Sequence, residues 1–308
     1  MILRRFLFLI LTGIIFLSCT TGVSEKEAAE AYYNLGNTYF DLGEYSKAVR
    51  AYQRALQLDS SFSMASYNLA RLYLETYDID QSITVLNEIL MEDSDNTIIL
   101  NTLGYAYTLQ ERNQEALDIF LSILERSPYD SNALYNSAVL YWKLENREKA
   151  LTQFQELYRN NPEDSDVLYN LGILEIELER PDGGIRYLEE YRKQEPNDTD
   201  ALTALGTLYE EEKYFDRALE IYNILTEKEG IPRDIYFRKA RILLTAIGDG
   251  EAGLKALEEA YVSGFEDKGQ YQALFEDPDL VNKEQVRIFL EEKGLLLLGE
   301  KEDDLLGE

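Results

Sequence analysis

Cys19 has the most definite chemistry in this 308-residue chain, because it is the only cysteine and it follows an apolar run. A thiol in that place can be acylated, but a lone cysteine forms neither an internal disulfide nor a thiolate metal cage. The chain also has no histidine, which excludes a Ser-His-Asp triad, a Cys-His pair and an imidazole zinc ligand. We therefore expect no metal and no cofactor.

Carboxylates are the other reactive groups: 58 Asp and Glu stand against 30 Lys and Arg, a formal charge of −28. Neighbours such as Glu189 and Glu190, or the run from Glu210 to Glu212, could act as acid and base in a hydrolase. So acidic a chain contains such pairs without any catalytic role, and it has no GxxxxGK(S/T) phosphate loop. We predict that the protein is not an enzyme, and its negative field argues against a nucleic-acid partner.

The first eighteen residues have the features of an export signal, because Arg4 and Arg5 precede an apolar run over residues 6–17. This run is shorter than the ~20 residues that a spanning helix needs. Its end, with Ser18 directly before Cys19, resembles a bacterial lipobox. The resemblance implies cleavage by signal peptidase II and acylation of Cys19, which would anchor the protein to a membrane. The alternative is an ordinary or uncleaved signal anchor in which Cys19 is incidental.

The lipobox resemblance also implies where the rest of the chain is found. Residues 1–18 would be removed as the signal peptide, and residues 19–28 would form a polar tether. Thr20, where some lipoproteins have Asp, resembles lipoproteins that are passed on to an outer membrane. We therefore expect a lipid-anchored protein of the cell envelope whose body faces the periplasm or the exterior.

The middle of the chain repeats with a period of 34 residues. One position of the repeat is always occupied by a small residue: Gly36, Ala70, Gly104, Ala138, Gly172 and Gly206. A leucine precedes it except at Ser137, and a tyrosine follows three places later except at Glu175. Sixteen places after the small residue stands a bulky one: Tyr52, Leu86, Phe120, Phe154, Leu188 and Tyr222. The three- and four-residue spacings predict two amphipathic helices per repeat, and the small residue lets the second helix approach the first.

The period and the order of these residues resemble the tetratricopeptide repeat (TPR), a helix-turn-helix unit. The resemblance implies an all-α fold, a right-handed superhelical solenoid of antiparallel helix pairs with terminal capping helices. Six repeats are assigned, at residues 29–62, 63–96, 97–130, 131–164, 165–198 and 199–232. A degenerate seventh repeat spans 233–265, capping helices span 266–299, and residues 300–308 form an acidic tail. Asp277-Pro278-Asp279 predicts a helix start within the capping region.

The family resemblance further implies a concave groove, lined by the first helix of each repeat, that holds a peptide or a partner helix. Helical spacing selects nine partner-binding residues: Tyr33, Asn37, Tyr67, Arg71, Tyr105, Tyr135, Trp142, Tyr169 and Ile173. The same spacing adds Phe40, Leu74, Asn101, Thr108, Val139 and Ile176. The alternative is that some of these, Tyr33 and Asn37 above all, only repeat the family consensus. For Asn34, Asn68, Asn136 and Asn170 we expect buried amides that bond between adjacent helices.

These observations predict a membrane-anchored, exported scaffold that binds a protein or peptide in its groove and recruits it to an envelope assembly. Tyr33 and Tyr67 stand where a chaperone-tail clamp would have lysines, which argues against that ligand. The acidic body suggests a partner with a basic or neutral face, although an acidic surface that serves solubility explains the charge equally well. An alternative function is a transport accessory that delivers a small hydrophobic ligand to a solute-binding protein.

Overall fold

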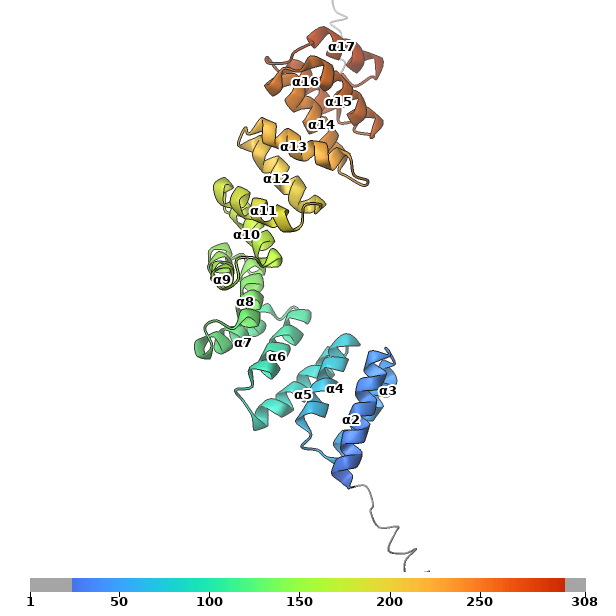
Figure 1. Ribbon diagram of the computed structural model, residues 1–308, viewed down its shortest axis with the longest axis vertical. Helices are drawn as coiled ribbons and strands as arrows, with labels where there is room; N and C mark the ends of the chain where they lie inside the picture. The colour runs from blue at the N-terminus through green and yellow to red at the C-terminus, as the bar shows by residue number, and fades with distance from the viewer. Residues whose placement is uncertain (1–23, 297–308) are drawn as a thin grey trace, which may run out of the picture. The chain divides into compact units, whose positions relative to one another are not determined.

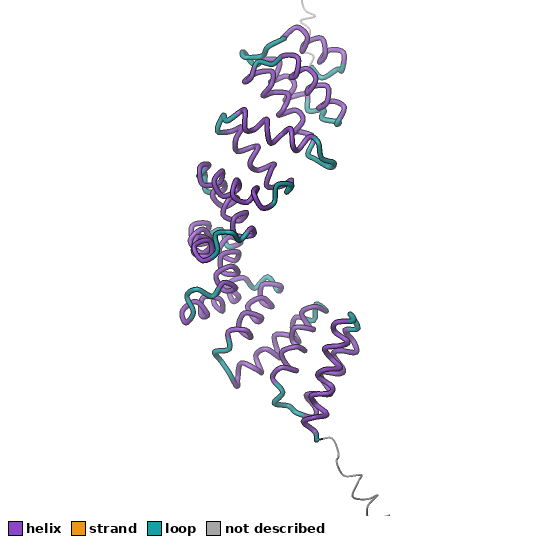
Figure 2. The backbone as a smooth tube through the Cα atoms, in the orientation of Figure 1, coloured by secondary structure: helices purple, strands orange, loops and turns teal. Residues whose placement is uncertain are grey.

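The computed structural model describes residues 24–296, which form sixteen α-helices and one π-helical turn, with no strand in that range (Figures 1 and 2). The all-α prediction is therefore confirmed. The predicted signal peptide, residues 19–23 of the predicted tether, which include Cys19, and the acidic tail lie outside the described residues. Residues 25–28, also predicted as tether, instead form the start of the first helix, Glu25–Asp41.

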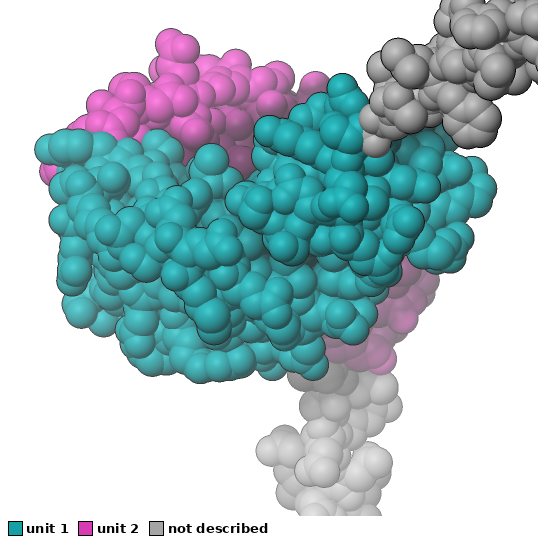
Figure 3. Space-filling model, turned by 90° about the horizontal axis from the view of Figure 1, so that it is seen from below, with its two compact units in different colours: residues 1–156 teal, residues 157–308 magenta. Residues whose placement is uncertain are grey.

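The chain divides into two compact units, residues 1–156 and 157–308, which Figure 3 colours separately. The first unit contains α2 (Glu25–Asp41), α3 (Tyr45–Leu58), α4 (Ser63–Glu75), α5 (Ile79–Glu92), α6 (Thr97–Leu109), α7 (Asn113–Arg126) and α8 (Ser131–Lys143). The chain passes from the first unit into the second within α9 (Arg147–Asn160). In the first unit α2 packs on α3, α4 on α5 and α6 on α7, and each pair contacts the next.

The second unit contains α10 (Ser165–Glu177), α11 (Pro181–Gln194), α12 (Thr199–Glu211), α13 (Phe215–Thr226), α14 (Arg233–Ile242), α15 (Gly250–Val262), α16 (Lys268–Glu276) and α17 (Lys283–Glu292). Here α10 packs on α11, α12 on α13 and α14 on α15. The helix pairs that the 34-residue period predicts are thus present in both units.

Four helices begin at an acidic or amide side chain that recurs every 34 residues. The N-cap residues of α6, α8, α10 and α12 are Asn96, Asp130, Asp164 and Asp198. In each, a side-chain oxygen accepts a hydrogen bond from the backbone N–H three residues later. Such a cap satisfies a backbone donor that has no partner within the helix and stabilises it by about 1 kcal/mol.

The turn inside each helix pair contains one residue with positive φ, again every 34 residues. The six residues are Gly43, Tyr77, Glu111, Glu145, Glu179 and Lys213, with φ between 57° and 69°. The next residue donates its backbone N–H to the carbonyl five positions earlier, as from Arg112 to Tyr107 at 3.0 Å. This hydrogen bond is that of a Schellman cap, which ends the first helix and leads into the second.

Close packing inside each pair depends on the small residue of the first helix. Gly36 and Gly104 lie against the rings of Tyr52 and Phe120, and a Cβ on either glycine would come within 2.6 Å of the ring. Both rings are buried, as is Ala48 in the second helix. The interior of each pair is therefore formed by a glycine or alanine on one helix and a bulky side chain on its partner.

In the second unit, Glu210 joins three helices through a buried carboxylate. It accepts hydrogen bonds from the Tyr222 hydroxyl at 2.7 Å and from the Arg238 guanidinium at 3.0 Å, and it pairs with Arg241. Burial alone would raise the pKa of Glu210, but the hydrogen bonds and charges of these partners outweigh it and lower that pKa. The carboxylate therefore stays ionised and ties α12 to α13 and α14.

The C-terminal end of the second unit departs from the expected helix start. Asp277-Pro278-Asp279 does not begin a helix: α16 ends at Glu276, and α17 begins at Lys283 after Asn282, which has φ of 49°. Pro278 disfavours helical backbone at Asp277, whose ψ is 127°. The Asp277 side chain instead accepts the backbone N–H of Asp279 at 2.9 Å, which closes a turn.

The terminal helices still cover the end of the second unit, because apolar residues from them complete its core. Tyr271 of α16 and Leu290 of α17 are buried with Phe237 of α14 and Leu257 of α15 in one cluster. Tyr271 also donates its hydroxyl to the carbonyl of Phe265 at 2.9 Å.

We predict that Glu111→Gly raises the free energy of unfolding by up to about 1 kcal/mol, because glycine adopts positive φ without steric cost. Gly43→Ala should lower it by a similar amount. Urea unfolding followed by helical circular dichroism measures both changes. The control is Glu88→Gly, an exposed position inside α5, where glycine should destabilise the helix. Equal destabilisation by Glu111→Gly and Glu88→Gly would contradict the account of the turn.

Candidate functional site

The first unit has a pocket of about 410 Å³ over the first helices of three successive pairs, here called the α4–α6–α8 pocket. Its lining residues are Tyr67, Arg71, Leu74, Glu75, Thr97, Ile98, Asn101, Thr102, Tyr105, Asp130, Asn132 and Asn136. A second pocket of about 400 Å³, the α2–α4 pocket, is lined by Asn37, Phe40, Asp41, Tyr52, Asn68 and Arg71. Arg71 lines both pockets, so the two adjoin along the same face.

The α4–α6–α8 pocket combines apolar side chains with groups that form hydrogen bonds. Ile98 is 63% exposed and Tyr105 is 48% exposed, although both are large hydrophobic residues. The Tyr67 hydroxyl lies 3.3 Å from the Thr102 hydroxyl, and the Arg71 guanidinium lies 5.9 Å from the Tyr67 ring. The pocket therefore presents rigid apolar area, one cation and several amides to solvent.

The α2–α4 pocket is braced by a small polar network. Asn68 donates to the Asn37 side-chain oxygen at 3.0 Å and to the Tyr33 hydroxyl at 3.2 Å. The Tyr52 hydroxyl donates to the same Asn37 oxygen at 2.7 Å. These bonds hold Asn37 and Asn68 in fixed orientations at the pocket wall.

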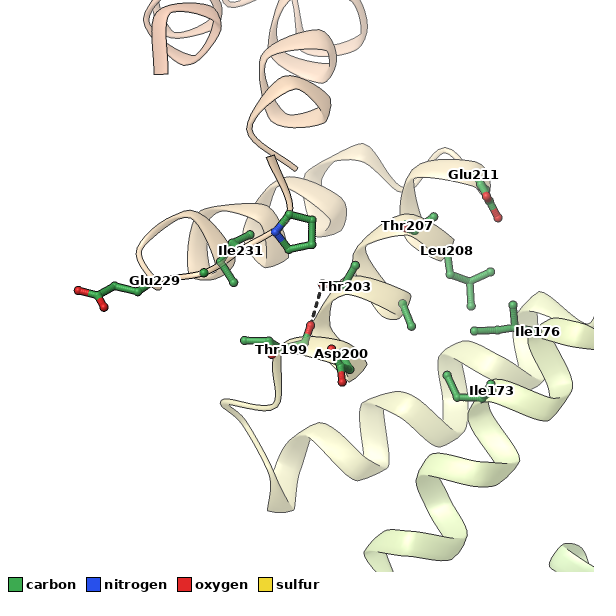
Figure 4. Close-up of a pocket in the computed structure, with 13 residues that line it drawn as sticks. Ile173, Ile176, Thr199, Asp200, Thr203, Thr207, Leu208, Glu211, Glu229 and Ile231 are labelled. Atoms are coloured by element: carbon green, nitrogen blue, oxygen red, sulfur yellow. Dashed lines mark hydrogen bonds between the residues drawn. The ribbon is translucent and has the colours of Figure 1, made fainter. Parts of the chain in front are cut away.

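The second unit has a pocket of about 530 Å³, here called the α10–α12 pocket (Figure 4). It is lined by Ile173 and Ile176 of α10, by one face of α12, and by residues 229–232 between α13 and α14. The Thr203 hydroxyl donates to the Thr199 carbonyl at 2.7 Å, as the dashed line in Figure 4 shows.

The structure divides the nine predicted partner-binding residues into two groups. Five line a pocket: Asn37, Tyr67, Arg71, Tyr105 and Ile173. The other four pack against aromatic rings of their own unit and line none of the three pockets: Tyr33, Tyr135, Trp142 and Tyr169. Trp142 and Tyr135, for example, both lie edge-on to the buried Phe154 ring.

The recurring asparagines are predicted to form hydrogen bonds between adjacent helices. This prediction is confirmed for Asn68 of α4, whose amide donates to side chains of α2. It is wrong for Asn34, which is exposed, and for Asn136, which donates to the carbonyl of Asn132 in its own helix and lines a pocket. A side chain that can bond to its own preceding turn needs no partner from the adjacent helix.

Comparison with known families decides what the helix pairs are. A family model described as tetratricopeptide repeat matches residues 29–62, and another with the same description matches residues 67–131, 135–199 and 169–230. The chain belongs to the tetratricopeptide repeat family. No curated protein sequence matches it.

Several solved structures share the fold at low sequence identity. A TPR protein from Parabacteroides merdae is 18% identical with a TM-score of 0.57, covering 86% of this chain and 98% of that one. The Pseudomonas aeruginosa pilF protein is 21% identical with a TM-score of 0.57, covering 66% and 92%. PilW, a widely conserved type IV pilus biogenesis factor, is 16% identical with a TM-score of 0.57, covering 68% and 97%.

Several lining residues of the α10–α12 pocket were not among the predicted set of TPR groove residues. Thr203 and Thr207 hold the same places in the sixth repeat as Tyr33 and Asn37 in the first, so the period itself could have found them. The sequence gives no comparable sign that Ile231 lines the pocket, because this residue lies in a connecting loop whose path depends on the neighbouring helices.

Between residues 24 and 296, no helix is both long enough and apolar enough to span a membrane.

Several tyrosines of the second unit, residues 157–308, are buried, and burial raises their pKa. Burial and a hydrogen bond to Glu189 raise the pKa of Tyr209 to about 12. Burial and a hydrogen bond to Asp198 raise the pKa of Tyr191 to about 12. The pKa of Tyr222 is raised above its usual value by burial and by the Glu210 charge.

We predict that alkali unfolds the protein between about pH 10 and pH 12, because these tyrosines ionise in the unfolded chain before they do so in the folded one. Their contribution to stability is present below the unfolded pKa and is lost as the pH rises through the folded pKa. Without histidine, no imidazole adds a slope near neutrality. Thermal melting against pH, with tyrosinate absorbance recorded in parallel, measures this. The double variant Tyr191→Phe and Tyr209→Phe should show a shallower alkaline loss. A single tyrosine titration near pH 10 that leaves the helices intact would contradict it.

Proposed function

We propose that the protein is an exported, membrane-anchored TPR scaffold that binds a protein or peptide and recruits it to an assembly of the cell envelope. The observation that carries this proposal is the α4–α6–α8 pocket, where Ile98 and Tyr105 stay exposed beside several amides. Exposed aromatic and aliphatic side chains among hydrogen-bonding groups are typical of polypeptide-binding surfaces. The signal-like first eighteen residues and the lipobox resemblance at Cys19 support the envelope location.

The lining of the pockets favours a polypeptide over a small hydrophobic ligand. A transport accessory would bury most of its ligand in a largely apolar cavity. The α4–α6–α8 pocket instead contains Arg71, Asn132 and Asn136. Amide side chains can donate to and accept from a peptide backbone, which suits an extended segment of a partner.

The positions of the acidic residues support a binding role rather than catalysis. Asp200 and Glu211 line the α10–α12 pocket but stand eleven positions apart on one helix, a rise of about 16 Å. Two carboxylates that share acid and base roles in a glycosidase lie within about 10 Å of each other. The fold likeness to PilW, a pilus biogenesis factor, is consistent with a role in envelope assembly.

Loss of Tyr105 tests the binding surface. Tyr105→Ala removes exposed aromatic area from the pocket, and we expect partner capture by photo-crosslinking in intact cells to fall about tenfold. Tyr129→Ala is the matched control, because Tyr129 is 69% exposed and lines none of the described pockets. Unchanged crosslinks in Tyr105→Ala, or equal losses in both variants, would contradict a binding role for this pocket.

Loss of Cys19 tests the anchor. With a fatty-acid analogue supplied to growing cells, Cys19→Ala should lose the label and leave the membrane fraction, since acyl chains hold the protein at the bilayer. Ser18→Ala keeps a small residue before the cysteine and should retain the label. Label that persists in Cys19→Ala would show that the anchor is not at this residue.

A further inference from the structure

The pockets of the two units differ in charge, although each lies over the first helices of its helix pairs. The α4–α6–α8 pocket contains a cation, Arg71, together with Glu75 and Asp130. The α10–α12 pocket is lined by Asp200, Glu211 and Glu229 and by no lysine or arginine. The electrostatic potential of this pocket is therefore negative because of its own lining residues, in addition to the surplus of acids in the whole chain.

The acidic side chains of the α10–α12 pocket are available to a ligand. Asp200, Glu211 and Glu229 are exposed, and none of them forms an ion pair with another residue between 24 and 296. Asp200 lies in the first turn of α12, next to α10, whereas Glu211 and Glu229 lie at the edges of the pocket and extend outward (Figure 4). The three carboxylates thus surround the pocket.

The floor between these carboxylates is apolar. Ile176 of α10 and Leu208 of α12 point toward one another, with Ile173 beside them (Figure 4). Ile231 closes the other side from the loop before α14. The Thr203 hydroxyl donates its hydrogen to its own helix, which leaves its oxygen free to accept a hydrogen bond within the pocket.

We propose that the α10–α12 pocket binds an extended segment of a partner polypeptide through a lysine or arginine side chain. This inference rests on the proposed function and names the chemistry of the partner at this pocket. Lysine and arginine have an apolar stem and a cationic head. The stem would lie on Ile173, Ile176 and Leu208, and the head would reach the surrounding carboxylates. A backbone N–H of the same segment can donate to the Thr203 oxygen.

Selection from a phage library of random short peptides on the full-length protein tests the proposal. The wild type should enrich peptides that contain lysine or arginine beside aliphatic residues. The triple variant Asp200→Asn, Glu211→Gln and Glu229→Gln should lose this enrichment. The matched control is Glu212→Gln, Asp216→Asn and Glu227→Gln, which removes the same charge from exposed residues that do not line the pocket and should keep the enrichment.

An enriched basic peptide then provides a direct measurement of affinity. By fluorescence anisotropy, its dissociation constant should rise about tenfold in the pocket variant and change little in the control. Equal enrichment or equal affinity in the two triple variants would overturn the proposal, as would peptides without basic residues. Neutral peptides that depend on Tyr105 but not on Tyr129 would overturn only this inference and leave the scaffold function standing. Failure to select any peptide would count against both.

Discussion

The close approach of two helices at a glycine or alanine is the contact on which each helix pair depends. A Cβ at Gly36, Gly104 or Gly206 would lie 2.5–2.7 Å from the ring packed against it, closer than atoms can come without displacement. The glycine is thus a steric requirement at these three positions. Because the second helix buries that face of the first helix, the opposite face remains for the pockets of each unit.

This constraint explains which parts of the fold could be predicted from the sequence. A small residue and its bulky partner sixteen positions later recur as residue types, so the period reveals both helices of a pair. The positive-φ turns recur equally regularly, but their residues include Glu111 and Lys213, whose types give no sign of that backbone. There the hydrogen bonds of the helix cap outweigh the residue's own preference. Pro278 shows the reverse, since it suggested a helix start where the chain forms a turn.

The candidate site could be predicted only in part, because equivalent positions have different neighbours. Tyr33 and Tyr67 occupy the same place in successive repeats, yet Tyr33 packs on Phe62 at 5.0 Å while Tyr67 lines a pocket. An aromatic side chain is packed where side chains of an adjacent helix or loop cover its ring, and it stays accessible where they do not. A repeat alignment identifies the face of the helix, and only the packed structure identifies the residues left open on it.

The local charge of each pocket likewise depends on which acidic residues have a basic partner nearby. The net charge of −28 is a count over the whole chain, whereas a ligand responds to those acids that no cation neutralises nearby. In the second unit, Arg238 and Arg241 bind Glu210, and Arg192 contacts Glu189 and Glu220. None of these arginines lines the α10–α12 pocket. Because these cations are held by other carboxylates, they do not neutralise the acids around the pocket, and the local potential there stays negative.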